Sequence, residues 1–360
     1  MRMALDEARA SIGLASPNPC VGCLIVTPGG VIAGRGRHLY DDRLHAEPVA
    51  LREAGGKARG ATVYVTLEPC AHTGRTPPCA EALVQAGVAR VVCAMQDPNP
   101  LVAGKGFAIL RKAGIAVETG LCEDEARQLN APFVKHIRTG LPLVTLKAAL
   151  SLDAKIAPAP AQRQAGTNYL SSPESLAEVH RLRHAADAIL VGIGTALADN
   201  PALTDRSGLP RRRPLLRIVL DSKLRLPLES RLVQSAHGDL LVAHTADAPA
   251  KVESLRRLGV ETLQLPAGGD GRCSLPELLK NLGERKILSL LVEGGTAVNT
   301  AFLEGSLADR LLLFYAPILL GAHAVPWIDG TGGQPRILAA SSRTFGQDLC
   351  VEATLRDLYA

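Results

Sequence analysis

The residues of this chain that can do chemistry are concentrated in a short stretch holding His45, Glu47, Cys70 and Cys79. One imidazole and two thiolates are three ligands that suit zinc, and they leave a fourth coordination position free for water. Bound zinc lowers the pKa of such a water toward neutrality. Glu47 follows the histidine by two residues, so its carboxylate can take a proton from that water and return it to a leaving amine. These residue types predict a hydrolytic zinc site with Glu47 as its catalytic acid and base.

The order of these residues is typical of zinc-dependent deaminases. His45-Ala46-Glu47 has the form H-x-E, and Pro69-Cys70 supplies the P-C that follows it in those enzymes. Eight residues separate Cys70 from Cys79, whereas the common pattern is P-C-x-x-C. A lone histidine or cysteine is usually structural, but this ordered combination is far more specific. The sequence therefore favours a catalytic zinc site.

A closed structural zinc site is the alternative, because Cys20 and Cys23 form a C-x-x-C pair that could join Cys70 and Cys79. Residues 22–26 have the apolar pattern of a buried strand, and buried cysteines commonly act as small hydrophobic residues. Retention of Glu47 also favours catalysis, since a structural site does not need a carboxylate that is not a ligand. The remaining cysteines, at 93, 122, 273 and 350, are expected to be inert.

Alternating strand and helix patterns are expected to position these residues. In the first part of the chain, strands are predicted at 22–26, 31–33, 62–67, 90–95 and 115–118, with helices at 46–54, 79–86 and 106–113. A boundary is predicted near Thr139-Gly140-Leu141-Pro142, giving domains 1–141 and 142–360. The second part restarts the alternation, with strands predicted at 143–147, 188–191, 215–221, 239–243, 286–292, 310–315 and 351–355, and helices at 173–183, 250–258, 275–282 and 297–303. The pattern predicts two α/β domains.

Composition narrows the class of ligand and the cellular setting. The 360 residues carry a formal net charge of +5 and only 3% aromatics, which suits a small anionic substrate better than a nucleic acid. The run from Leu311 to Ile328 is free of charges, but Pro317 and Pro326 interrupt it, so a buried strand and a loop are predicted in place of a membrane span. The first residues lack the pattern of a secretory signal, and we expect a cytoplasmic protein with no membrane partner.

Further motifs extend along nearly the whole chain. In the first part they are NPCVG at 18–22, PCAHTGRTPPC at 69–79, MQDPNP at 95–100 and VAGKG at 102–106. In the second part they are SLD at 151–153, LADNPALT at 197–204 and VEGG at 292–295. In this order they resemble the family of bifunctional riboflavin-biosynthesis deaminase/reductases. The long spacing between Cys70 and Cys79 is part of that family's pattern.

The resemblance implies a cytidine-deaminase-like three-layer α/β/α domain followed by a dihydrofolate-reductase-like α/β domain. The first would use Zn²⁺ to release, as ammonia, the 2-amino group of 2,5-diamino-6-ribosylamino-4(3H)-pyrimidinone 5′-phosphate. The second would use NADPH to reduce the ribosyl group of that product, giving 5-amino-6-ribitylaminouracil 5′-phosphate. The resemblance also implies a homo-oligomer, dimer or tetramer, formed through the second domain.

The resemblance assigns further contacts residue by residue. The deaminase substrate would touch Asn18, His72 and Arg75. The nicotinamide cofactor would touch Leu150, Tyr169, Thr195, Asp199, Ser222, Gly295, Thr296 and Ala297. The reductase substrate would touch Thr167, Arg183, Leu203, Arg206 and Glu293. Two residue-based arguments agree with this: glycines between a strand and a helix suit a phosphate, and the charges of Arg183 and Arg206 suit a 5′-phosphate.

Several positions near the expected reductase site depart from the family pattern. Ala154 stands where the family usually has glycine, Tyr169 where it often has tryptophan, and Thr167 where it has serine. A working deaminase joined to an impaired reductase is therefore one alternative. A nucleic-acid deaminase, such as a tRNA adenosine editor, is another, although a second α/β half and the absence of a basic, aromatic stripe disfavour it.

Overall fold

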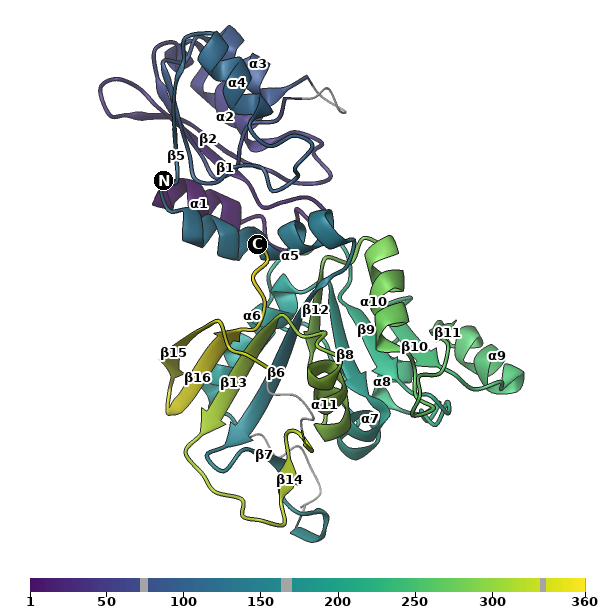
Figure 1. Ribbon diagram of the computed structural model, residues 1–360. Helices are drawn as coiled ribbons and strands as arrows, with labels where there is room; N and C mark the ends of the chain where they lie inside the picture. Colours follow the sequence, from purple (N-terminus) through teal and green to yellow (C-terminus); the bar gives the residue numbers. More distant parts are fainter. Residues whose placement is uncertain (72–76, 163–169, 331–334, 360) are drawn as a thin grey trace. The chain divides into compact units, whose positions relative to one another are not determined.

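The computed structural model describes residues 1–71, 77–162, 170–330 and 335–359 (Figure 1). The chain divides into two compact units. The first comprises Met1–Gly140, with Pro210–Arg212 and Tyr359, and the second comprises Leu141–Leu209 and Arg213–Leu358. No helix of the described residues is long and apolar enough to cross a membrane.

The first unit is built around a five-stranded mixed sheet in the order β2-β1-β3-β4-β5. β1 pairs antiparallel with β2 and β3, whereas β3, β4 and β5 run parallel. The elements follow the chain in the order α1 (Arg2–Arg9), β1 (Gly22–Val26), β2 (Ile32–Arg37), α2 (Ala46–Ala54), β3 (Thr62–Val65), α3 (Cys79–Ala86), β4 (Arg90–Cys93), α4 (Lys105–Lys112), β5 (Ala116–Thr119) and α5 (Glu123–Thr139).

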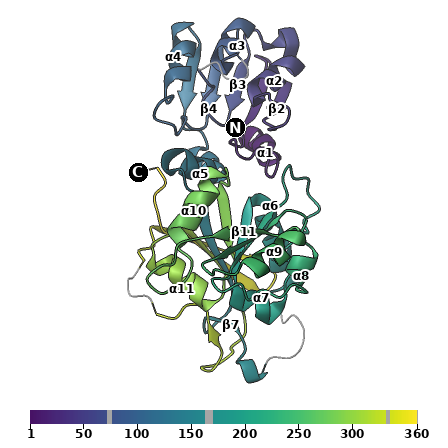
Figure 2. The same ribbon diagram turned by 90° about the vertical axis from the view of Figure 1, so that its right-hand side faces the viewer.

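Helices cover both faces of this sheet, and two glycines in neighbouring strands show how closely they pack. A Cβ at Gly22 would lie 2.0 Å from the Ala4 carbonyl of α1, and one at Gly36 would lie 2.0 Å from the Ala46 carbonyl of α2. Gly36 pairs with Cys23, the residue after Gly22, so the two glycines face opposite sides of the sheet. α2, α3 and α4 lie side by side on the face opposite α1 (Figure 2). The unit therefore has the expected three layers.

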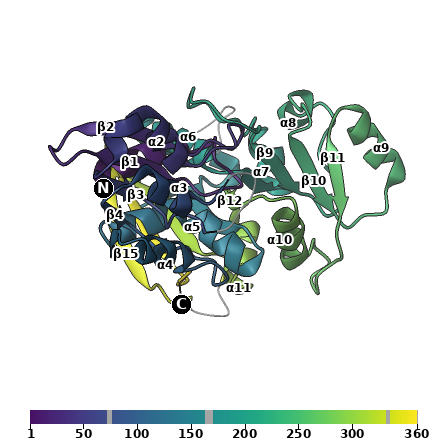
Figure 3. The ribbon, with the colours of Figure 1, turned by 90° about the horizontal axis from the view of Figure 1, so that it is seen from above.

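The second unit contains a nine-stranded sheet in the order β11-β10-β9-β8-β12-β6-β13-β16-β15. The first seven run parallel, and β16 and β15 complete the sheet antiparallel. β11 and α9 lie at one end of this sheet, beyond β10 (Figure 3). The strands are β6 (Leu143–Ser151), β7 (Lys155–Ala157), β8 (Ala188–Gly192), β9 (Leu216–Leu220), β10 (Leu240–His244), β11 (Glu261–Gln264), β12 (Ser289–Val292), β13 (Arg310–Ala316), β14 (Val325–Pro326), β15 (Ala339–Phe345) and β16 (Asp348–Thr354).

Both faces of the parallel strands are buried. In β8, Leu190 belongs to one hydrophobic cluster and Ile189 to the cluster on the other side. This burial is typical of parallel sheets covered by helices on two faces. The helices of the unit are α6 (Pro173–Ala185), α7 (Ile193–Asp199), α8 (Arg231–Gln234), α9 (Pro249–Arg257), α10 (Leu275–Glu284) and α11 (Thr296–Glu304).

The alternation predicted from the sequence is confirmed for the elements that carry a clear apolar period. The charge-free run at 311–328 forms most of β13 and then a loop that contains the two-residue strand β14, in agreement with the predicted strand and loop. Among the elements that were not predicted are α5, whose pattern is interrupted by Pro132 inside the helix, and β15. Residues 339–344 of β15 are all exposed and therefore show no apolar alternation.

The turn between β6 and β7 explains the departure at Ala154. This residue adopts φ of +57°, a left-handed conformation that glycine adopts without strain but that is strained for alanine. The turn is fixed from outside, because the Asp153 carboxylate accepts hydrogen bonds from Leu320 N–H at 3.0 Å and Gly321 N–H at 2.7 Å. The backbone therefore keeps a conformation that the side chain at 154 disfavours.

We predict that Ala154→Gly stabilises the second unit by about 0.5–1 kcal/mol, because relief of left-handed strain exceeds the entropy cost of glycine. Urea denaturation followed by fluorescence of Trp327, the single tryptophan, measures the change. Ala177→Gly in the exposed face of α6 is the matched control and should lower stability by about 1 kcal/mol. Equal destabilisation by both substitutions would contradict the assignment of strain to Ala154.

Candidate active sites

The zinc ligands predicted from the sequence meet in the first unit. His45 is the residue before α2, Cys79 is the first residue of α3, and Cys70 lies in the chain that follows β3. One ligand atom from each lies within 4.8 Å of the other two. The His45 Nδ1 is 3.2 Å from the Cys79 Sγ and 3.5 Å from the Cys70 Sγ. Three separate segments thus bring one imidazole and two sulfurs to a single point.

The electrostatics of this cluster fit a bound cation. The hydrogen bond from Cys79 and, after it, that from His45 lower the pKa of the Cys70 thiol despite its burial. The pKa of Cys79 is raised by its hydrogen bond to Cys70, by burial and by the negative charge of Glu47. A second thiolate therefore requires a compensating positive charge at this point. A nitrogen and two sulfur donors are the chemistry that zinc prefers.

Glu47 stands beside the three ligands without being one of them. It lies in the first turn of α2 and is only 3% exposed. Burial raises its pKa to about 7, because the desolvated carboxylate is costly to ionise. Both protonation states are therefore accessible near neutral pH, as a group that accepts and returns a proton requires.

His38 connects Asn18 to the zinc cluster, and the sequence analysis did not consider it. The Asn18 Nδ2 lies 3.0 Å from the His38 Nε2, and the His38 Nδ1 lies 2.7 Å from the Leu44 carbonyl oxygen. The His38 ring packs edge-on against the His45 ring, with 5.5 Å between centroids. Asn18 is thus held one side chain away from His45. No sequence spacing marks His38, because its role arises from the fold.

Glu68 supports the loop that carries Cys70 and was also missed. Its buried carboxylate accepts four backbone hydrogen bonds from two segments that are distant in sequence. The donors are Asp97, Gly104, Gly106 and Phe107. A Cβ at Gly106 would lie 1.9 Å from the Pro69 carbonyl, so the chain before Cys70 rests directly on the start of α4. The MQDPNP and VAGKG motifs therefore brace the zinc site.

The closed four-cysteine alternative is not formed. Cys23 lies in the middle of β1, where it is fully buried and pairs with Val65. Within the described ranges, the His45, Cys70 and Cys79 cluster is the group with the geometry of a metal site. Two other predicted contacts of the deaminase, His72 and Arg75, lie outside the described residues.

The predicted cofactor residues of the second unit gather where parallel strands end. Leu150 lies in β6, Thr195 and Asp199 in α7 after β8, and Ser222 just after β9. Gly295, Thr296 and Ala297 begin α11 after β12. In open α/β sheets the carboxyl ends of the strands are where ligands bind. Tyr169, the remaining cofactor prediction, lies outside the described residues, as does the predicted substrate contact Thr167.

The start of α11 fits a phosphate-bearing cofactor. A Cβ at Gly294 would lie 2.7 Å from the Val298 Cγ1, and one at Gly295 would lie 3.1 Å from the Thr195 Oγ1. Glycine thus keeps the backbone open at the point where α7 and α11 meet. The first N–H groups of a helix lack partners within the helix and attract anions. These donors suit a phosphate group such as those of NADPH.

A buried charge cluster joins the predicted substrate residues. Arg183 donates from Nε and Nη2 to the two carboxylate oxygens of Glu293, at 2.8 and 2.9 Å, and from Nη1 to the Thr204 carbonyl at 3.2 Å. The Lys147 Nζ, which the sequence analysis missed, lies 3.9 Å from the same carboxylate. Burial alone would raise the pKa of Glu293, but the charges of Lys147 and Arg183 outweigh it and hold that pKa at about 2.

The other two substrate predictions lie close to this cluster along the chain. Leu203 is buried, next to the Thr204 carbonyl that Arg183 binds. Arg206 is exposed, and its backbone N–H donates to the His180 Nδ1 at 3.3 Å. Arg183 is therefore committed to partners within the protein, whereas Arg206 presents its charge to solvent.

Comparison with known proteins finds a family match in each unit. Residues 1–95 match the cytidine and deoxycytidylate deaminase zinc-binding region, and residues 142–351 match the RibD C-terminal domain. The chain is 42% identical to the riboflavin biosynthesis protein RibD of Escherichia coli (strain K12), over 98% of this chain and 97% of that protein. The corresponding protein of Aquifex aeolicus is 42% identical over 89% of this chain and 87% of its own length.

Solved structures show the same likeness over the full length. The structure of Acinetobacter baumannii RibD (form 1) is 37% identical, with a TM-score of 0.85 over 99% of this chain and 98% of that chain. A diaminohydroxyphosphoribosylaminopyrimidine deaminase/5-amino-6-(5-phosphoribosylamino)uracil reductase from Thermotoga maritima is 32% identical, with a TM-score of 0.83 over 99% and 97%.

Fold and sites together define a two-part enzyme, a zinc-dependent deaminase joined to an NADPH-dependent reductase. The chain belongs to the RibD family of bifunctional riboflavin-biosynthesis deaminase/reductases. Its second half is the family's reductase domain, so no finding favours a nucleic-acid deaminase. The substrate is a small molecule, as the composition indicated.

We predict that Glu293→Gln lowers the free energy of unfolding of the second unit by about 3 kcal/mol at pH 7, because Lys147 and Arg183 lose their common anion. The depressed pKa of about 2, against the usual 4.5, stabilises the native state above about pH 4.5. That contribution is lost as the pH falls toward 2. Urea denaturation at several pH values, followed by Trp327 fluorescence, measures both effects.

The matched control is Glu261→Gln, which removes the half-exposed partner of Arg285 and should cost less than about 1 kcal/mol. The wild-type protein and this control should lose stability on acidification in the same way, while Glu293→Gln should show a shallower loss. Identical pH profiles for all three would contradict the charge cluster.

Proposed function

We propose that residues 1–141 carry the deamination, with zinc held by His45, Cys70 and Cys79 and with Glu47 as the proton carrier. The observation that supports this most strongly is the pairing of a three-donor cluster with a buried carboxylate that is not a ligand. A purely structural zinc site has no use for such a carboxylate. The expected substrate is 2,5-diamino-6-ribosylamino-4(3H)-pyrimidinone 5′-phosphate, and its 2-amino group leaves as ammonia.

In this reaction the zinc ion, when bound, acts as a Lewis acid that makes a water molecule acidic enough to attack at neutral pH. Glu47 accepts the proton that this water gives up and delivers it to the departing amine. The buried position of Glu47 at the start of α2 keeps bulk water from competing for that proton. Asn18, fixed through His38 beside His45, donates to the sugar or ring of the substrate. His72 and Arg75 remain proposed contacts to the same substrate.

We propose that residues 142–360 carry the reduction, with NADPH bound across the carboxyl ends of the parallel strands. Gly295, Thr296 and Ala297 receive the cofactor phosphates, while Leu150, Tyr169, Thr195, Asp199 and Ser222 border the remainder of the cofactor. NADPH supplies the hydride, so the protein needs only to orient the two reactants. Glu293, set by Arg183 and Lys147, faces the ribosyl group, and Thr167 and Leu203 complete the pocket. The exposed guanidinium of Arg206 takes the 5′-phosphate.

The eight cysteines are free among the described residues, which supports a reducing compartment such as the cytoplasm.

We also propose that the protein forms a homo-oligomer through its reductase part. Size-exclusion chromatography with light scattering on the full chain tests it, and a monomeric mass at micromolar concentration would refute it.

Glu47→Gln tests the deaminase assignment. We expect ammonia release to fall at least about 100-fold, because a general acid–base group is lost, while bound zinc stays at the wild-type level. Ammonia is measured with the diaminopyrimidinone substrate, and zinc is measured by elemental analysis of the same samples. NADPH oxidation should be unchanged when the deaminated product is supplied directly.

Glu81→Gln, an exposed residue in the first turn of α3, is the control and should release ammonia at the wild-type rate. Full activity of Glu47→Gln would overturn the proton-carrier role. For the wild-type protein, ammonia without NADPH oxidation would instead favour the alternative in which the reductase half is impaired.

A further inference from the structure

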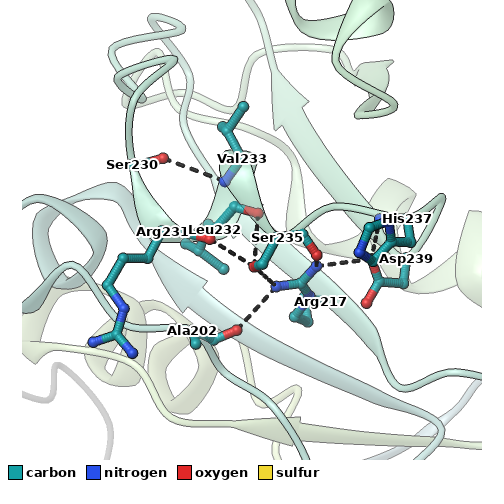
Figure 4. A network of polar contacts seen from close by, with 9 residues as sticks. All are labelled: Ala202, Arg217, Ser230, Arg231, Leu232, Val233, Ser235, His237 and Asp239. Carbon is teal, nitrogen blue, oxygen red and sulfur yellow. Dashed lines mark hydrogen bonds and ion pairs between the residues drawn. The ribbon is translucent and has the colours of Figure 1, made fainter.

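A buried arginine of the second unit binds the segment that carries two of the predicted substrate contacts. Arg217 belongs to β9, and its side chain is only 1% exposed. From Nη1 it donates to the Ala202 carbonyl at 3.0 Å and to the Ser235 Oγ at 2.8 Å. From Nη2 it donates to the Ser235 carbonyl at 2.8 Å and to the Asp239 Oδ1 at 2.7 Å (Figure 4). One guanidinium thus ties together three segments that are distant in sequence.

The segment bound through Ala202 matters most for function. Residues 199–206 carry the predicted cofactor contact Asp199 and the predicted substrate contacts Leu203 and Arg206, and we call them the pocket loop. A second tie comes from α8, where the Arg231 N–H donates to the Asn200 Oδ1 at 2.8 Å. Arg217 and α8 therefore hold the pocket loop at Ala202 and Asn200, and Arg183 holds the same loop at the Thr204 carbonyl.

The backbone of the pocket loop needs such restraint. Asn200 has φ of +40° and Leu203 has φ of +53°. Asparagine tolerates this left-handed region, but leucine rarely adopts it and persists there only when the surroundings fix the chain. Leu203 lies between the two carbonyls that Arg217 and Arg183 hold. The hydrogen bonds on each side thus fix a conformation that the side chain disfavours.

Burying an apolar side chain at position 217 of β9 would cost less free energy than burying arginine, because a buried guanidinium must be paired. The charge of Arg217 is balanced by Asp239, whose carboxylate also accepts the His237 N–H at 2.9 Å. What the guanidinium adds is several donors in a rigid plane, which reach acceptors in two distant segments at once, at Ala202 and at Ser235 and Asp239. Lysine, a single point of charge, cannot do the same.

We infer that Arg217 is a positioning residue for the reductase: through the Ala202 carbonyl it sets the conformation in which the pocket loop presents Leu203 and Arg206 to the substrate. This inference rests on the proposed function, because the substrate contacts of the loop are part of that proposal. Arg217 itself touches neither substrate nor cofactor in this account.

The test uses the full zinc-loaded chain and the Arg217→Lys variant. Calorimetry measures the Kd of the deaminated product, and steady-state kinetics gives KM and kcat for NADPH-dependent reduction. We expect Kd and KM to rise about tenfold, the effect of losing a charged hydrogen bond, with a smaller change in kcat. Ammonia release by the first unit of the same molecule should be unchanged, which provides an internal control. Arg285→Lys, at an exposed ion pair of the same unit, should leave Kd and KM at wild-type values.

Asn200→Gly is the second variant, because it keeps the left-handed backbone accessible and removes the tie to Arg231 without disturbing a buried charge. We expect Kd for the deaminated product to rise about fivefold. If Arg217→Lys fails to fold, this variant still tests whether restraint of the pocket loop sets the affinity, and an unchanged Kd would contradict the inference.

A merely structural Arg217 would lower the melting temperature and the active fraction while Kd and KM stayed at wild-type values, and that result would overturn the inference. Wild-type protein that binds the deaminated product without reducing it would refute the proposed reductase function. In that case the change in Kd between wild type and the variants still decides the role of Arg217.

Discussion

The deaminase half depends on one electrostatic constraint. Two cysteine sulfurs and the buried Glu47 carboxylate converge beside a single imidazole. Without a cation, only one of the two thiols can ionise readily, as the opposite pKa shifts of Cys70 and Cys79 indicate. A divalent ion relieves this repulsion, and the same arrangement leaves Glu47 buried, uncoordinated and able to hold a proton. The surrounding architecture keeps these groups together, through the start of α2, the start of α3 and the loop braced by Glu68.

The reductase half also contains buried charged side chains that hold the chain around its proposed site. Glu293 is kept ionised in a buried position by Lys147 and Arg183, and Arg183 also holds the Thr204 carbonyl. Arg217, balanced by Asp239, holds the same loop through the Ala202 carbonyl. In both halves, then, charges buried beneath a site fix the chain that presents the reacting groups. Burying such charges costs free energy, but it orients the groups that bind the reactants, and orientation matters for catalysis.

Much of this could be predicted from the sequence, and the failures have physical reasons. His45, Glu47, Cys70 and Cys79 were found because the chemistry demands those residue types in order, and the fold brings the three predicted ligands together. The helix α5 was not predicted, because it contains Pro132 and a proline interrupts the sequence pattern that is typical of a helix. The polar residues of β15 gave no apolar alternation.

His38, Glu68 and Lys147 were missed for a different reason. Each acts through neighbours that only the tertiary fold supplies: a ring against His45, four backbone donors, or a carboxylate on a neighbouring strand. Ala154 was recognised as a departure from the family pattern, but its positive φ became visible only in the folded turn. Spacing along the chain reports ligands and turns, whereas residues that support them are specified by contacts between distant segments.

The central claim is that zinc takes one nitrogen and two sulfurs from this chain and keeps one position for water. X-ray absorption at the zinc edge of the loaded, full-length protein tests it directly. We expect two sulfur neighbours at about 2.3 Å and two nitrogen or oxygen neighbours at about 2.0–2.1 Å. Three or four sulfur neighbours would contradict it, because Cys20 or Cys23 would then be a ligand and the open position that hydrolysis requires would be lost.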